Sequence, residues 1–177
     1  MSSSSQSSAE HLQGPIGRAL VWFTSTRIGQ LIYVRVVPPI DRRMMLKSKG
    51  QKSLSPHGDP NGPGGLALLS TIGSKTGKER HTPLGYARDG DNIVMLASNA
   101  ARSYHPNWYY NLKKHPEVTI TLGGGPQNRY RAEEIPDGPE RERLWKVMTS
   151  LNPGFDEYPA RTKGRLIPVI NCTPIKD

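Results

Sequence analysis

The later part of the chain is dominated by short apolar runs that are separated by turn residues. These runs predict strands over 66–71, 80–88, 92–98, 117–122, 128–135 and 166–170. Within Glu117–Leu122, Val118, Ile120 and Leu122 alternate with polar residues, as in a strand buried on one face. The segment Asp89-Gly90-Asp91 between two runs is typical of a β-hairpin. Strands joined by such turns indicate a small, mostly antiparallel barrel rather than a doubly wound parallel sheet.

Two helices are predicted among these strands, so the fold class is mainly β with α (α+β). Residues 105–116 place Pro106 in the first helical turn and Trp108 and Leu112 four apart on one face, before Pro116 ends the helix. A second helix is expected from about 137 to 150. Its inward residues are predicted to be Leu144, Val147 and Met148.

The first part of the chain has a different organisation. We predict a disordered tail over 1–13, an N-terminal helix and loop over 14–65, and the barrel over 66–177. In the middle segment a helix is expected from Pro15 to Val37, stopped by Pro38-Pro39, with a short basic helical turn at 41–47 and a long loop at 48–65. The Ser-rich start has no basic and apolar regions of the kind that form a signal peptide.

The net charge of the chain predicts a binding partner. The 177 residues carry a net charge of +9 with a pI of about 9.8, which predicts an anionic partner: nucleic acid, an anionic membrane surface or a small acidic ligand. The basic residues are spread along the chain without a recognised nucleic-acid motif, so no nucleic acid is expected. The lone Cys172 excludes an internal disulfide and is expected to be a buried, inert thiol, in keeping with a reducing cytoplasm.

Residues 14–37 are apolar enough to raise the question of a membrane. Arg18, Arg27 and Arg35 interrupt them, so no uncharged run of about 18 residues remains for a membrane span. A helix packed on the core is favoured over an interfacial helix anchored by Trp22, Phe23 and Tyr33. Peripheral membrane contact through residues 14–37 therefore stays open beside a cytoplasmic location.

The segment between the first two predicted strands is the strongest candidate binding site. Residues 73–80 hold two glycines, the hydroxyls of Ser74 and Thr76, and the cations Lys75, Lys78 and Arg80, which together predict an anion site at a sharp turn. A solvated hairpin tip is the alternative. A nucleoside triphosphatase loop is excluded, because only three residues separate the glycines and Glu79 follows Lys78.

No self-sufficient catalytic group is evident in the sequence. The five histidines are scattered without metal-ligand spacing, no nucleophile elbow is present, and the adjacent pairs Glu133-Glu134 and Asp156-Glu157 point apart within a regular element. No metal is expected. If the protein is an enzyme, a bound cofactor is expected to supply the chemistry.

An ordered series of segments resembles the deazaflavin-dependent nitroreductase family, split β-barrel oxidoreductases similar to FMN-binding barrels that use coenzyme F420. The segments are Ser70–Gly77, Arg80, Pro83-Leu84, Asp89–Asp91, Ala97–Asn99, His105–Leu112, His115–Val118 and Arg165–Val169. The resemblance is weak before Leu66. It implies a reduced deazaflavin with a phosphodiester and an oligoglutamate tail, which is strongly anionic.

The resemblance also implies roles for individual residues. Those expected to bind the cofactor are Ser74, Lys75, Thr76, Lys78, Arg80, Pro83, Ala97, Ser98, Asn99 and Trp108. Trp108, Phe155 and Tyr158 are expected to line the substrate site, and Ser98 and Tyr158 to take part in catalysis. The chain departs from the family pattern at Ser74, where Arg is usual, at Asn99, and at Phe155, where members that reduce bulky nitro compounds have tyrosine.

The function implied is hydride transfer from reduced F420 to a small electron-poor acceptor, such as a quinone, an enone or other activated alkene, or a nitro compound. The alternative is a non-catalytic protein that binds fatty acid, lipid or the deazaflavin at the membrane surface. The sequence gives no indication of oligomeric state or of the physiological acceptor.

Overall fold

The computed structural model describes residues 39–40, 42–48, 52, 62–123, 125–151 and 153–176. Apart from Pro39 and Ile40, which are helical, these residues belong to one compact unit that begins at Asp41. The predictions for the tail at 1–13, the helix at 15–37 and most of the loop at 48–65 fall outside the described residues. Within the described ranges, no helix combines the length and the apolar character needed to cross a membrane.

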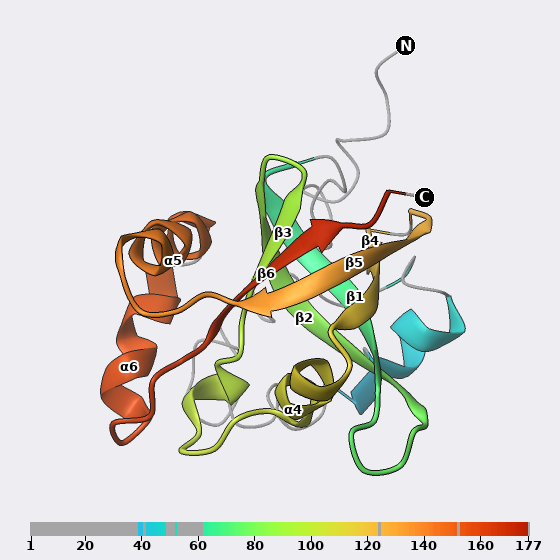
Figure 1. Ribbon diagram of the computed structural model, residues 1–177, viewed down its shortest axis with the longest axis horizontal. Helices are drawn as coiled ribbons and strands as arrows, with labels where there is room; N and C mark the ends of the chain where they lie inside the picture. Colours follow the sequence, from blue (N-terminus) through green and yellow to red (C-terminus); the bar gives the residue numbers. More distant parts are fainter. Residues whose placement is uncertain are drawn as a thin grey trace, which may run out of the picture. The chain divides into compact units, whose positions relative to one another are not determined.

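Six antiparallel strands form a closed barrel (Figure 1). Their bounds are β1 (Gly64–Ile72), β2 (Glu79–Asp89), β3 (Asn92–Leu96), β4 (Glu117–Leu122), β5 (Gln127–Glu134) and β6 (Val169–Pro174). Their order around the barrel is β1-β2-β3-β6-β5-β4, and β4 pairs with β1 to close it. The predicted antiparallel barrel and the hairpin at Asp89–Asp91 are confirmed, with Gly90 in the left-handed region at φ 61°.

Two strand predictions need correction at their ends. β3 stops at Leu96, so Ala97 and Ser98 belong to the following loop. The last strand begins at Val169 rather than at Leu166, whose side chain is 56% exposed, and it runs on to Pro174. The sequence hid this extension because Asn171 and Thr173 interrupt the apolar run, although the strand pairs with β3 on one side and with β5 on the other.

The barrel strands separate two apolar clusters. The first fills the interior and includes residues from all six strands, among them Leu69, Tyr86, Met95, Ile120 and Ile170. The second lies on the outer face of the barrel, where α5 packs. Along β6 the side chains alternate between the clusters, because Val169 joins the outer cluster while Ile170 and Cys172 join the interior. Cys172 is buried, as predicted, and burial raises the pKa of its thiol to about 12.

Helices cover different parts of this barrel. The predicted helix after His105 is α4 (Asn107–Lys114), whose Trp108 and Leu112 join the interior cluster. The second is α5 (Pro139–Leu151), whose Leu144 and Met148 are buried in the outer cluster. Two short helices not predicted from the sequence follow it, η2 (Pro153–Glu157) and α6 (Tyr158–Arg161), and Figure 1 shows α5 and α6 on the same side of the barrel.

The short basic helical turn predicted at 41–47 is present as helical residues 42–47. Met45 on this segment is fully buried, whereas Arg42 and Arg43 are exposed. The Nε of Arg42 donates a hydrogen bond to the carbonyl oxygen of His81 in β2 at 3.2 Å. An apolar anchor and a polar contact therefore hold this segment against the barrel.

Candidate functional site

The basic turn, residues Gly73–Lys78 between β1 and β2, has a tightly bonded backbone. The amide of Gly73 donates to the carbonyl of Lys78 at 2.9 Å, and the amide of Gly77 donates back to the carbonyl of Gly73 at 2.8 Å. Gly77 has φ +66°, and a Cβ at Gly73 would lie 2.8 Å from Oγ1 of Thr76. Glycine is therefore required at 77 because of the positive φ, and at 73 because a side chain would not fit.

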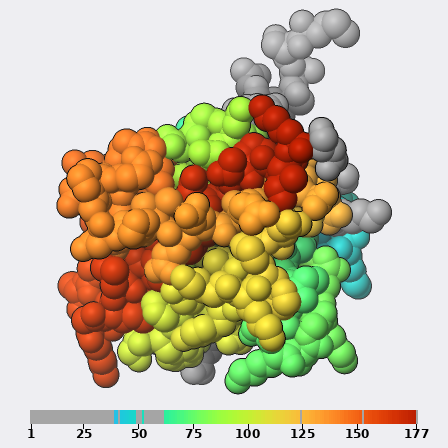
Figure 2. Space-filling model, viewed as in Figure 1, coloured from blue at the N-terminus to red at the C-terminus, as the bar shows by residue number. Residues whose placement is uncertain are grey.

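Helix α4 lies beside the basic turn and fixes it (Figures 1 and 2). Asn111, which is 6% exposed, accepts a hydrogen bond from the amide of Ser74 at 2.9 Å and donates one to Oγ1 of Thr71 at 3.0 Å. Nζ of Lys114 donates to the carbonyl of Ser74 at 2.8 Å. In Figure 2 the green turn projects beside the yellow surface of α4. The buried side-chain amide of Asn111 is hydrogen-bonded through both its oxygen and its nitrogen, so its removal would leave buried partners unpaired. This side chain therefore fixes the position of the turn.

A cavity of about 660 Å³ opens beside the turn, a volume suited to a small ligand. We call it the basic cavity, and its lining residues are Arg42, Gly73, Ser74, Lys75, Thr76, Arg80, His81, Thr82, Asn107, Trp108, Tyr110 and Asn111. Three of these are permanent cations, and among the described residues that line it there is no Asp or Glu. Arg42, Lys75 and Arg80 form no ion pair with any described residue. Such a cavity attracts a multiply charged anion.

The basic cavity brings together five of the residues predicted to bind the cofactor: Ser74, Lys75, Thr76, Arg80 and Trp108. Lys78 belongs to the same turn but is exposed and does not line the cavity as far as the described residues define it. Pro83 lies farther along β2, opposite Leu68 of β1.

The other predicted residues form a second group, outside the basic cavity. Ala97 is buried and Ser98 and Asn99 are half-buried, on the loop that follows β3. Phe155 and Tyr158 come from η2 and α6, with their ring centroids 5.2 Å apart in an edge-to-face arrangement, and both pack against the outer cluster. The two parts of this second group are neighbours, because α6 lies against η1 (Asn99–Ala101) of the same loop.

The loop after β3 has an unusual backbone. Asn99, Ala100 and Ala101 have φ values of 51°, 52° and 59°, three consecutive residues other than glycine in the left-handed region. Each such residue costs free energy and persists only where surrounding contacts impose it. Strain of this kind is concentrated at ligand sites, and Asn99 is the one of these three residues that is also predicted to bind the cofactor.

Arg165 supplies several of the contacts that impose this conformation, beside a hydrogen bond from the Asn99 side chain to the carbonyl of Tyr104 at 2.9 Å. Its guanidinium donates to the carbonyl oxygens of Ala97 at 3.2 Å, Ser98 at 2.7 Å and Arg102 at 2.9 Å. It also lies 3.1 Å from Nδ1 of His105. One side chain from the segment before β6 thus holds both ends of the loop, and burial lowers the pKa of this arginine without removing its charge.

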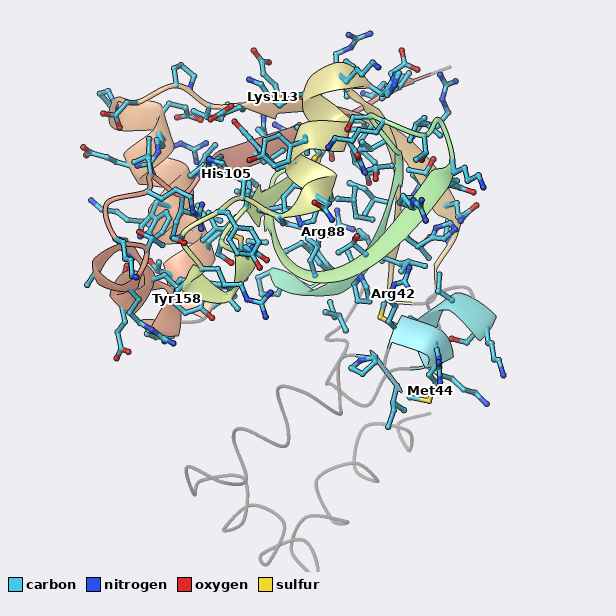
Figure 3. The ribbon with its side chains drawn as sticks, turned by 90° about the horizontal axis from the view of Figure 1, so that it is seen from below. Arg42, Met44, Arg88, His105, Lys113 and Tyr158 are labelled. Atoms are coloured by element: carbon cyan, nitrogen blue, oxygen red, sulfur yellow. The ribbon has the colours of Figure 1, made fainter. Side chains whose placement is uncertain are left out.

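A network of titratable side chains lies next to the loop (Figure 3). The ring of His105 lies over that of Tyr109 with centroids 4.6 Å apart, and the Tyr109 hydroxyl donates to Glu134 at 2.8 Å. Lys113 pairs with the same carboxylate at 3.0 Å. Burial and the proximity of Arg165 lower the pKa of His105, whereas burial and Glu134 raise that of Tyr109 to about 12. This network fixes α4 to β5 close to the residues that Arg165 holds.

Sequence reasoning missed three residues of these two regions. Asn111 had a signal, since it lies three positions after Trp108, where a polar side chain on an apolar helix face must find partners. No sequence signal places Arg42 near the basic turn, because the long segment at 48–65 separates the two in the chain. Arg165 was quoted among the resembling segments without a role, because a hydrogen-bonding arginine does not differ in sequence from a solvated one.

Comparisons with known proteins agree with this architecture. Residues 39–174 match the model of the family described as F420H(2)-dependent quinone reductase. The F420H(2)-dependent quinone reductase Rv1261c of Mycobacterium tuberculosis is 38% identical over 118 residues, which is 66% of this chain and 78% of that protein. A second protein of the same organism, the putative F420H(2)-dependent quinone reductase Rv3178, is 33% identical over 107 residues, 60% of this chain and 87% of that protein.

A solved structure is similar at the level of the fold as well. The structure described as an F420-H2 dependent reductase (FDR-A) superposes with a TM-score of 0.55 at 35% sequence identity. The match covers 60% of this chain and 92% of the solved chain. It extends the predicted resemblance from single segments to the three-dimensional arrangement of the barrel.

Proposed function

The chain belongs to the F420H(2)-dependent quinone reductase family, and on that premise we propose that it is an oxidoreductase that uses reduced coenzyme F420 to reduce a small electron-poor acceptor. One observation carries the proposal for this chain in particular. It is the basic cavity, in which Arg42, Lys75 and Arg80 face a common space and are not neutralised by any described carboxylate.

The residues present fit the cofactor. Its phosphodiester and glutamate carboxylates need several cations and hydrogen-bond donors, and the cavity has Lys75, Arg80 and the hydroxyls of Ser74 and Thr76. Lys78, which is exposed on the same turn, would add a further positive charge close to the opening. Trp108 would contact the deazaflavin ring, and Pro83 and the backbone of Ala97–Asn99 would border it. These assignments rest on charge, position and the family resemblance.

When bound, reduced F420 supplies a hydride from its deazaflavin ring to the acceptor. The protein has to hold the acceptor, exclude water and stabilise the negative charge that the acceptor gains with the hydride. Ser98 and Tyr158, on neighbouring segments, are the proposed donors to that charge. A proton from the Tyr158 hydroxyl or from solvent completes the reduction, and Phe155, whose ring meets that of Tyr158, forms an apolar surface for the acceptor.

The acceptor class that we favour is the quinones, with enones and other activated alkenes next. Both are planar, apolar and electron-poor, which would suit the aromatic rings assigned to the acceptor, Trp108 in the basic cavity and Phe155 and Tyr158 in the second group. Nitro compounds are less favoured, because Phe155 lacks the hydroxyl of the tyrosine that nitro-reducing members have there.

Oxidation of reduced F420 by the purified protein tests this proposal. We expect menadione to oxidise the reduced cofactor much faster with the protein than in a protein-free control. The reaction is measured as the return of the absorbance of the oxidised deazaflavin. Tight binding without turnover on menadione, an enone or a nitroarene would instead favour the cofactor or lipid carrier. If the protein does not bind F420, the basic cavity is not a cofactor site, and both the enzyme and the cofactor carrier are excluded.

Two further proposals concern where the protein acts. The first is a cytoplasmic location, where the reduced cofactor and a reduced Cys172 are expected. The second is peripheral contact of residues 14–37 with an anionic bilayer. The net charge of +9 supports the second. Sedimentation with anionic and with neutral lipid vesicles tests it, since only the anionic vesicles should carry the protein down.

A further inference from the structure

The basic cavity has a cation that comes from outside the barrel. Lys75 and Arg80 belong to the basic turn and to the start of β2, whereas Arg42 belongs to helical residues 42–47, far earlier in the chain. Figure 3 labels Arg42 where this helical segment meets the barrel strands. Met45, fully buried one turn later, keeps the segment in place, so the position of Arg42 follows from packing.

Among the described residues, the contacts of Arg42 leave most of its hydrogen-bonding capacity for a ligand. Its Nε donates to the carbonyl of His81 at 3.2 Å, which orients the planar guanidinium at the cavity wall. The two terminal nitrogens have no partner among the described residues. An oriented guanidinium with two terminal NH2 groups has the geometry that recognises a phosphate or a carboxylate through two parallel hydrogen bonds.

Charge favours the same conclusion. Three cations around one space repel each other, and no described Asp or Glu in the lining relieves that repulsion. A ligand with two or more negative charges relieves it, and it gains most if it contacts cations from both segments of the chain. Arg43, the next residue on the same segment, is exposed and does not line the cavity as the described residues define it, so the two adjacent arginines differ in position and not in chemistry.

We propose that Arg42 is a cofactor-binding residue, which contacts the anionic end of F420 together with the cations of the basic turn and the start of β2. This inference rests on the proposed function and extends it, because it makes the helical segment ahead of the barrel part of the binding site. The anionic end is then held between two elements of the chain rather than on one turn.

Calorimetric titration with oxidised F420 tests the proposal, using Arg42→Ala and the matched control Arg43→Ala. Arg42→Ala should raise the dissociation constant about tenfold, the effect of losing one charge-assisted contact, and Arg43→Ala less than twofold. Arg42→Lys keeps the charge and should recover part of the loss, whereas Arg42→Gln should not. Thermal unfolding of each variant checks that the helical segment still packs. We expect unfolding temperatures close to that of wild type, because the buried Met45 is unchanged.

Two further measurements separate a direct contact from a general effect. The difference between Arg42→Ala and wild type should shrink at high salt, where exposed charges are screened. It should vanish for the deazaflavin with its ribityl chain alone, which has no phosphate or glutamate. Equal weakening by Arg42→Ala and Arg43→Ala, or equal weakening for both ligands, would overturn the inference while leaving the proposed function intact. Failure of wild type to bind F420 would overturn the proposed function itself.

Discussion

The basic turn at Gly73–Lys78 and the loop after β3 were both predicted to contact the cofactor, yet they are built in opposite ways. The turn presents cationic side chains to an open cavity, and its backbone is held by its own hydrogen bonds and by Asn111. The loop presents mainly backbone, in a left-handed conformation held by Arg165, by the side chain of Asn99 and by two backbone hydrogen bonds of its own. The turn should therefore lose binding when side chains are removed, and the loop should lose structure.

The largest effect is expected from Arg165→Ala. The substitution removes the Arg165 donor from the partly buried carbonyls of Ala97 and Ser98 and the contact that ties the two ends of the loop together, so we expect a loss of about 3 kcal/mol in unfolding free energy. Chemical denaturation measures it. Arg165→Lys should recover less than half, because an ammonium cannot reach carbonyls at both ends of the loop.

Lys163→Ala is the control for this change, since Lys163 is exposed on the same segment. It should leave stability within about 0.5 kcal/mol of wild type. If Arg165→Ala were no more destabilising than this control, the contrast between the two regions would not hold.

Next in size are Lys75→Ala and Arg80→Ala, which should each weaken binding of F420 by about 1–3 kcal/mol with little change in stability. Fluorescence titration with the cofactor measures the first quantity and thermal unfolding the second. Lys78→Ala should have a smaller effect, because Lys78 does not line the cavity formed by the described residues. Unchanged affinity in both Lys75→Ala and Arg80→Ala would contradict the assignment of the turn.

A pH effect is expected where α4 meets β5, beside the loop. Burial acts to raise the pKa of Glu134, but hydrogen bonds from Lys113 and Tyr109 outweigh it and hold that pKa below the ordinary value of 4.5. Because the folded state favours the ionised form, this stabilisation is complete above pH 4.5 and is lost as the pH falls through the lower folded-state pKa.

Thermal unfolding of wild type and Glu134→Gln between pH 7 and 3 checks the sign. Wild type should be the more stable at pH 7, and the two curves should converge as the solution is acidified. A difference that grew at low pH would show that Glu134 is not held in its ionised form by these contacts.

The smallest effect on binding is expected from Phe155→Tyr. The ring lies half-buried on the outer cluster, away from the basic cavity, so the affinity for F420 should stay within a factor of about two. The added hydroxyl should instead change the ratio of kcat/KM values for a nitroarene and menadione in favour of the nitroarene. Identical acceptor profiles for the two proteins would remove Phe155 from the substrate site.

The same contrast explains what the sequence could predict. The barrel strands, α4, α5 and the basic turn were predictable because their signals are local: alternation, helical spacing, and glycines beside cations. The loop after β3 was predictable only through the family resemblance, because nothing in Asn99-Ala100-Ala101 indicates a left-handed backbone. That conformation depends on Arg165, more than sixty residues later in the chain. Arg42 was missed for the same reason, since only the folded chain brings it to the turn.

Isothermal titration of oxidised F420 at low ionic strength, into wild type and into the double variant Lys75→Ala/Arg80→Ala, tests most directly whether the basic turn binds the acidic part of the cofactor. We expect a clear heat of binding with wild type that falls as salt is added, and none or very little with the correctly folded double variant. No heat with wild type, or the same heat with both proteins, would contradict it.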